Sequence, residues 1–182
     1  MVARQIFSFT DPERIVIGTV GIPGEREFFI QIRDARELRS FSMEKGQASA
    51  LAQRCREILR EINAPGSAIE PDNAPLEVPV ESEFPSGVMS LLWDSEKARL
   101  LLEIQSAISP IDGTAAEDLL GDEADNAPPI LRAHFTTEQA REFVRRTEEV
   151  VAAGRAPCMF CGGPIDLSGH LCPRANGYRR RE

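Results

Sequence analysis

The sequence predicts an α+β fold made of two pseudo-repeated antiparallel sheet-plus-helix modules. Short segments in which apolar and polar residues alternate predict strands, and two longer segments with apolar residues three and four apart predict helices. The two helical segments match in phase when Gln47–Ala52 is aligned with Gln139–Val144, which indicates an internal repeat. We therefore place one module at residues 1–66 and a second at 67–154, ahead of a distinct segment at 155–182.

The first module is predicted to contain four strands and one helix. Alternating apolar residues place the strands near residues 6–9, 15–19, 28–32 and 38–43. Gly18, Gly21 and Gly24 are expected to shape the hairpin between the second and third strands, because the helix that a phosphate-binding loop requires does not follow them. A helix over residues 45–63 ends the module, and its apolar residues form one buried face that includes Cys55.

The second module is predicted to repeat this order with one insertion. Prolines keep the stretch after residue 70 extended and largely unpaired. Alternation then places strands near residues 78–84, 87–93, 100–104 and 130–135. Residues 110–128 hold six acids and no base, so we expect an acidic insertion that is too polar to be buried. Thr136 offers capping chemistry for the second helix, which ends at Gly154.

The composition indicates a soluble protein with an uneven charge. Hydrophobic residues make up 42 % of the chain, no run approaches the roughly 18 apolar residues of a membrane span, and the N-terminus lacks a secretory signal. We expect a cytoplasmic protein with no membrane partner. Residues 155–182 carry five arginines against two acids, a charge of +3, so the net charge of −8 leaves −11 on residues 1–154. That acidic part should repel nucleic acid at long range.

Four metal-ligating residues follow the second helix in a spacing typical of a structural zinc site. Cys158 and Cys161 form a Cys-x-x-Cys turn ahead of two glycines. His170 and Cys172 are two residues apart, so both side chains face the same side of an extended strand. Three thiolates and one imidazole would complete a tetrahedral zinc ion and leave no position for water. We therefore predict a zinc knuckle in which Zn²⁺ is structural and not catalytic.

Other uses of these cysteines stay open. A redox Cys-x-x-Cys pair normally opens a helix, whereas a Gly-Gly-Pro sequence follows this one. A structural disulfide requires an oxidising compartment, and no secretory signal is present. The thiols can also have no function of their own.

The end of the chain supplies the candidate recognition surface. The knuckle would hold nearby a segment with an amide, an aromatic ring and several guanidinium groups, namely Arg174, Asn176, Tyr178, Arg179, Arg180 and Arg181. We expect a protein partner to bind this segment, which would make the chain a non-catalytic zinc-binding adaptor. RNA binding, through stacking on Tyr178 and phosphate contacts from the arginines, is an alternative. A third interpretation is that the arginines only keep the terminus in water.

An enzyme with an active site between the two modules is a further alternative. Arg33 lies on a strand of the first module, and Glu103 and Gln105 lie on the corresponding strand of the second, so these side chains could line a shared cleft. His134 joins them because, with His170 assigned to zinc, it is the remaining side chain suited to proton transfer near neutral pH. Charges that protect sheet edges explain the first three equally well. A half-exposed position in a sheet is the simpler explanation of His134.

Several segments resemble one uncharacterised family. They are Phe7-Ser8-Phe9, Gly18-Thr19-Val20-Gly21, Pro23-Gly24-Glu25-Arg26, the helix from Glu44 to Leu51, and the ending with Cys-x-x-Cys-Gly-Gly-Pro and Gly-His-x-Cys-Pro-Arg-x-Asn-Gly-Tyr-Arg-Arg. Together they are similar to an actinobacterial-type conserved hypothetical family, a domain of unknown function of about this length. The resemblance spans nearly the whole chain and is most specific at the ending. It implies no assigned activity.

Overall fold

The fold combines one sheet with two helices. The computed structural model describes residues 4–22, 24–66, 70–107, 127–154, 157–163, 165 and 170–174. Over these residues the elements are β1 (Ile6–Phe9), β2 (Arg14–Val20), β3 (Glu27–Arg33), β4 (Leu38–Met43), α1 (Lys45–Glu61), β5 (Ser82–Asp94), β6 (Arg99–Ser106), β7 (Ile130–Phe135) and α2 (Thr137–Ala152). The predicted α+β class is confirmed.

The strands form one sheet instead of two, which corrects the predicted architecture. The seven strands lie in the order β1-β7-β6-β5-β4-β3-β2. Neighbours are antiparallel except for β1 with β7 and β4 with β5, which are parallel. The parallel pairing of β4 with β5, at Ser40 with Ser82 and at Ser42 with Pro85, joins what we had predicted to be two separate sheets. The strands predicted near 78–84 and 87–93 are instead one long strand, β5.

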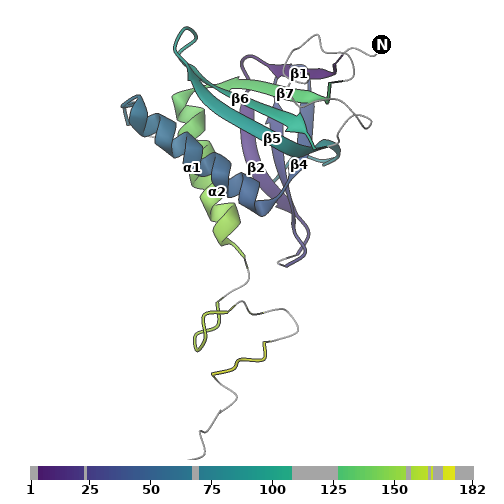
Figure 1. Cartoon of the computed structure of the whole chain (residues 1–182), viewed down its shortest axis with the longest axis vertical. Coiled ribbons are helices and arrows are strands. Elements are labelled where there is room, and N and C mark those ends of the chain that lie inside the picture. The colour runs from purple at the N-terminus through teal and green to yellow at the C-terminus, as the bar shows by residue number, and fades with distance from the viewer. Residues whose placement is uncertain are drawn as a thin grey trace, which may run out of the picture.

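The sheet curls strongly. β1 and β2 are its two edge strands, yet only residues 10–13 connect them along the chain. A link of this length spans at most about 18 Å, so the two edges must approach each other. The curl also brings the ring centroids of Phe7 on β1 and Phe41 on β4 to 5.4 Å from each other, although β7, β6 and β5 lie between these strands in the sheet. The bend of the sheet can be followed in Figure 1. β1 was expected to belong with the first module, and it pairs instead with β7.

Both helices pack against the same apolar face. The predicted face of α1 is buried, with Leu51, Cys55 and Ile58 in the core. The two helices pack against each other, and α2 also packs against β2. α2 begins as expected, because the side chain of Thr136 accepts a hydrogen bond from the backbone N–H of Gln139 at 3.2 Å. Burial raises the pKa of the Cys55 thiol to about 12, as expected for a core residue without a redox role.

Each helix follows three antiparallel strands, since β2–β4 precede α1 and β5–β7 precede α2. This shared order of elements does not by itself establish an internal repeat, so the repeat stays a prediction. The module boundaries at residues 66 and 154 also stay predictions. Most of the acidic insertion predicted at 110–128 lies outside the described residues.

Residues 70–80, which we call the strap, were expected to be an unpaired linker. They are extended but firmly attached to the sheet. Arg14 on β2 forms an ion pair with Asp72 at 2.6 Å, and the Gln31 amide exchanges two hydrogen bonds with the backbone of Glu77. Leu76 lies directly over Gly18, where an added Cβ would come within 2.5 Å of the Leu76 side chain. Gly18 therefore makes room for the strap, whereas Gly21 and Gly24 have the positive φ angles expected of the hairpin turn.

Buried polar groups tie the strap to α2. Arg146 is only 7 % exposed, and its guanidinium donates to the carbonyls of Ile17 and Asp72 at 2.9 and 2.6 Å. The Glu142 carboxylate accepts from the backbone N–H of Asp72 at 2.8 Å. Burial alone would raise the pKa of Glu142, but hydrogen bonds from Arg145 and Asp72 outweigh it and lower the pKa. These contacts pair part of the backbone of edge strand β2, which would otherwise be open to another chain.

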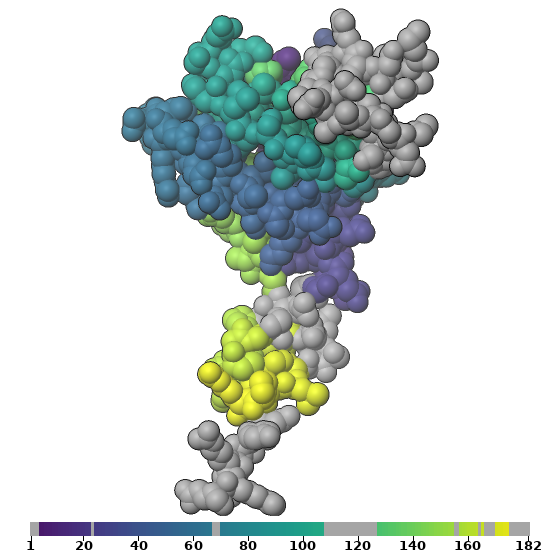
Figure 2. Space-filling view, in the orientation of Figure 1, coloured from purple at the N-terminus to yellow at the C-terminus, as the bar shows by residue number. Residues whose placement is uncertain are grey.

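The chain continues beyond α2 into a small separate lobe that contains the four predicted metal ligands (Figure 2). This lobe lies past the C-terminal end of α2, away from the sheet (Figure 1). Over the described residues, neither helix is long and apolar enough to cross a membrane.

Candidate metal centre

The structure brings the four predicted ligands together. One ligand atom from each of Cys158, Cys161, His170 and Cys172 can be chosen so that all four lie within 4.8 Å of one another. The sulfurs of Cys158 and Cys172 are 3.7 Å apart, and the Cys161 sulfur is 3.0 Å from Nε2 of His170. A tetrahedral ion with metal–sulfur bonds of about 2.3 Å would separate two sulfurs by about 3.8 Å. The four side chains could therefore hold a metal ion together.

The backbone of the first turn folds tightly around Cys158 and Cys161. Gly162 has a φ of 74°, a left-handed conformation that glycine adopts without strain. Its N–H donates to the carbonyl of Cys158 at 2.8 Å, and the N–H of Cys158 donates to the carbonyl of Gly163 at 2.7 Å. The N–H of Gly163 also lies 3.4 Å from the Cys161 sulfur. This tight turn brings the first two sulfurs to one side, as predicted from the two glycines.

The cysteines do not form a disulfide. None of Cys55, Cys158, Cys161 and Cys172 is disulfide-bonded, and the 3.7 Å between the sulfurs of Cys158 and Cys172 far exceeds a disulfide bond of about 2.05 Å. The backbone N–H groups of Cys161 and Phe160 lower the pKa of Cys158 to about 7. They favour the thiolate, which is the form that binds a metal. The Cys-x-x-Cys pair leads into a turn and not a helix, unlike the usual redox arrangement.

Three large apolar side chains lie exposed on the surface of the knuckle. Met159 and Leu171 are each 87 % exposed, and Phe160 is 57 % exposed. Each of the three lies between two ligands in the sequence, so the ligands point inward to one another while these side chains point outward. The ligand spacing itself could have revealed this surface, because residues between metal ligands have no core to enter.

The predicted recognition segment is described at one residue only. Arg174 donates from Nη1 to the carbonyl of Phe160 at 3.2 Å, which fixes the arginine against the first turn. Asn176, Tyr178, Arg179, Arg180 and Arg181 lie outside the described residues.

The cleft candidates have separate partners in the structure. Arg33 is on β3, and Glu103 and Gln105 are on β6, so β4 and β5 separate them within one sheet. Arg33 forms an ion pair with Glu77 of the strap at 2.9 Å. Glu103 forms one with Arg132 of β7 at 2.6 Å, and Gln105 lies opposite Ile130 in the same strand pair. The shared cleft was predicted from two packed modules, and it stays a prediction.

His134 belongs to a local polar cluster on β7. Its Nε2 is 2.9 Å from the ammonium of Lys97 and 3.6 Å from the carboxylate of Asp94. Burial, followed by the charge of Lys97, lowers the pKa of His134. A neutral ring that accepts a hydrogen bond from Lys97 explains this geometry, and the histidine is more buried than the half-exposed position expected, at 8 %.

Comparison with known proteins identifies the family and no activity. The family described as "Protein of unknown function (DUF3090)" matches residues 7–172, which include all four ligands. No curated protein and no solved structure matches the chain. The match covers most of the sequence, so the chain belongs to the DUF3090 family.

Proposed function

We propose that the protein is a non-catalytic adaptor whose C-terminal knuckle is held by a structural zinc ion. The observation that carries the proposal is the set of three sulfurs and one imidazole nitrogen converging on one point. Soft thiolates with an imidazole select zinc over hard ions such as Mg²⁺ or Ca²⁺. Four protein ligands complete a tetrahedral ion, so no position remains for a water molecule to be activated.

Zinc would supply the stability that the knuckle cannot draw from a core. Among the described residues of the knuckle, the large apolar side chains are exposed, and the best-buried side chains are Cys158 and Cys172, at 7 % and 5 %. Structural zinc contributes an apparent 10 to 16 kcal/mol, roughly, to the folding of small finger peptides. A contribution of that order would hold the turns in place without a hydrophobic core.

The partner would be a protein that covers the exposed apolar side chains of the knuckle. Met159, Phe160 and Leu171 are large exposed apolar side chains, and groups of such side chains on a surface mark sites of protein–protein interaction. The negative charge of residues 1–154 favours protein over nucleic acid as the partner. The predicted arginines at the end of the chain would then contribute polar contacts at the rim.

A pull-down from native cells tests this proposal when zinc is measured in the same samples. The double variant Met159→Ser with Leu171→Ser removes the apolar surface and keeps every ligand, so we expect it to bind zinc and lose the partner. Val88→Ser, at a side chain that is 73 % exposed on the sheet, is the matched control and should retain the partner. Cys161→Ala should lose both zinc and partner. A partner that binds the zinc-loaded double variant as well as the wild type would contradict the proposal.

RNA binding through the knuckle is the second candidate. The exposed ring of Phe160 could stack on a base, and Arg174 is fixed beside it, next to the predicted tail arginines. This candidate predicts binding of short single-stranded RNA that weakens as salt rises and is lost when Arg179, Arg180 and Arg181 are replaced by alanine. If no RNA binds at low salt, this candidate is wrong.

A further inference from the structure

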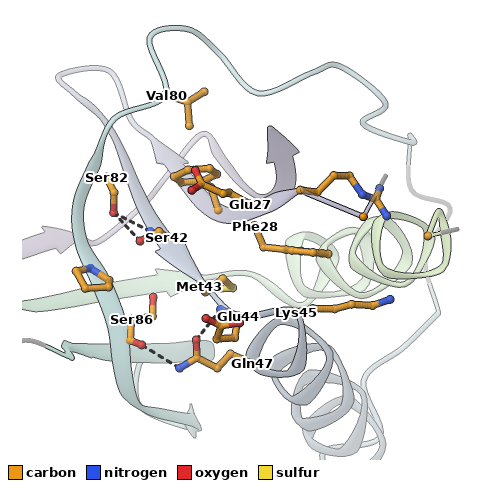
Figure 3. Close-up of a pocket in the computed structure, with 15 residues that line it drawn as sticks. Glu27, Phe28, Ser42, Met43, Glu44, Lys45, Gln47, Val80, Ser82 and Ser86 are labelled. Carbon is orange, nitrogen blue, oxygen red and sulfur yellow. Dashed lines mark hydrogen bonds between the residues drawn. The ribbon is translucent and has the colours of Figure 1, made fainter. Parts of the chain in front are cut away.

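A cavity separate from the knuckle lies where the two halves of the sheet join. It has a volume of about 720 Å³, and its walls come from the hairpin between β2 and β3, the end of β4, the start of α1 and the start of β5 (Figure 3). This volume falls in the range of pockets that hold small molecules, roughly 300 to 1,000 Å³. The cavity contains none of the four metal ligands, so it is distinct from the metal centre.

The topology explains why a hollow forms at this place. β4 and β5 are parallel neighbours up to Ser42 and Pro85, and beyond this pair the strands part. β4 ends at Met43 and the chain turns into α1, whereas β5 continues along β6. The Gln47 side chain fills one wall of the gap by donating to the carbonyls of Ser86 and Gly87, at 2.9 and 3.2 Å. Crevices beyond the carboxyl end of a strand, where neighbouring chains diverge, are common ligand sites in open sheets.

One end of the cavity carries two cationic side chains. Arg26 and Lys45 both line it, and neither forms an ion pair with any other part of the chain that the structure describes. The Nε atom of Arg26 is also buried without a hydrogen-bond partner among those residues. By contrast, Arg14, Arg33 and Arg39 on the neighbouring strands are all ion-paired with carboxylates.

A glycine leaves the space beside both cations open. A Cβ atom placed on Gly154 would lie 3.7 Å from Nζ of Lys45 and 4.0 Å from Nη2 of Arg26. Both cationic groups therefore border one small space that Gly154, having no side chain, does not fill. The amino end of α1 adds a partial positive charge nearby.

Two acidic side chains, equal in number to the cations, also line the cavity. Glu44 precedes α1, and its carboxylate takes part in the capping box with Gln47. Glu27 lines the cavity and forms no ion pair with the described residues. At the opposite wall, Ser42 and Ser82 present hydroxyl groups that bond to each other at 3.0 Å. Figure 3 shows Lys45 extending away from the wall formed by Ser82 and Ser86.

We propose that this cavity binds a small polar molecule through a phosphate or carboxylate group held between Arg26 and Lys45. The anion would occupy the space beside Gly154, and the rest of the molecule would extend over Phe28 and Met43 toward the hydroxyl groups of Ser42 and Ser82. Arginine and lysine together are well suited to this task, because the guanidinium fork binds two oxygens and the ammonium adds a compact charge.

The test is a titration of the full-length protein with inorganic phosphate and, separately, with succinate. Binding is monitored through the NMR signals of the backbone amides of Lys45, Gln47 and Ser86. Binding of either anion supports the site, and comparison of the two anions identifies the preferred group. Arg26→Gln with Lys45→Gln should weaken binding about tenfold or more, while Arg60→Gln, which removes an exposed charge at the other end of α1, should leave it unchanged.

A third variant checks the location of the anion. Gly154→Leu places a side chain in the space between the cations and should block binding without removing any charge. Thermal unfolding of each variant confirms that the fold is intact. If neither anion shifts the three amide signals at concentrations up to about 10 mM, or if the charge-removing double variant binds as the wild type does, the proposal is wrong.

Discussion

The body of the protein and its knuckle bury opposite kinds of side chain. In the body, the aromatic rings of Phe7, Phe41 and Phe84 meet at distances of 4.7 to 5.9 Å, and Phe41 is fully buried. In the knuckle, Cys158 and Cys172 are buried while Met159 is 87 % exposed. The body is therefore stabilised by the burial of apolar surface, whereas we propose that the knuckle is stabilised by the attraction of its ligands to an ion. Each region should therefore unfold under conditions in which the other stays folded.

Removal of the metal should have the largest effect, and it should affect the knuckle alone. A strong chelator should unfold the turns around Cys158 while the thermal unfolding of the body stays unchanged. Thiol labelling measures this directly. We expect the three knuckle cysteines to react once the chelator is present, and Cys55 to react only when the body unfolds, because burial raises its pKa to about 12.

Either of two outcomes of this experiment would contradict the account. A chelator that lowers the unfolding temperature of the body would show that the two regions are coupled. Knuckle cysteines that react equally with and without the chelator would show that no metal protects them.

Removal of a core ring should have the next largest effect, and it should affect the body alone. Phe41→Ala opens a cavity in the aromatic cluster at the centre of the sheet, and such changes cost about 3 to 5 kcal/mol. Denaturant unfolding measures the loss, and the zinc content should not change. Phe160→Ala is the matched control, because that ring is 57 % exposed and its removal should leave the stability of the body unaltered. Equal losses in the two variants would contradict the comparison.

Disruption of the contact between the strap and the sheet should lower the free energy of unfolding by less than removal of a core ring does. Gly18→Ala forces Leu76 away from β2, and we expect a loss of about 1 to 3 kcal/mol in the free energy of unfolding. Gly46→Ala serves as the control, because nothing lies within 4 Å of an added Cβ there and alanine favours a helix by about 0.5 to 1 kcal/mol. If Gly18→Ala is as stable as the wild type, Leu76 does not hold the strap in the way described.

Loss of the polar contacts of the strap should have the smallest effect on the free energy of unfolding, and this effect should depend on pH. The hydrogen bond from Arg14, followed by its charge, lowers the pKa of Asp72 in the folded protein. This carboxylate therefore stabilises the fold above its unfolded pKa of about 3.9, and the contribution is lost as the pH falls through the lower folded value.

We expect Asp72→Asn to cost about 1 to 2 kcal/mol at pH 7 and progressively less in acid. Urea unfolding at a series of pH values measures the difference. Asp11→Asn, at an ion pair on an exposed carboxylate, should change stability little at any pH. A constant cost of Asp72→Asn from pH 7 to pH 3 would contradict the role given to its charge.

The sequence predicted features that depend on neighbouring residues better than those that depend on distant ones. Apolar spacing predicted a helix over 45–63, and α1 is Lys45–Glu61. The two ligand pairs were found because each pair is local, with two residues or one between its members, and the structure brings the pairs together.

The partner of each strand could not be predicted in the same way. The alternation in Ile6–Phe9 indicates a strand, but it carries no information that its neighbour is Ile130–Phe135, far along the chain. The same limit produced the two separate sheets, because periodicity assigns a face to each strand without fixing its neighbours. The strap was mistaken for an unpaired linker because its attachments, such as Arg146 to Asp72, join residues far apart in the sequence.

X-ray absorption at the zinc edge, combined with metal analysis of the purified full-length chain, tests the central claim most directly. The account predicts one zinc ion per chain, with about three sulfurs at about 2.3 Å and one nitrogen at about 2.0 to 2.1 Å. A chain that contains no zinc, or an ion whose shell includes an oxygen from water in place of a cysteine sulfur, would contradict a closed structural site at the end of this fold.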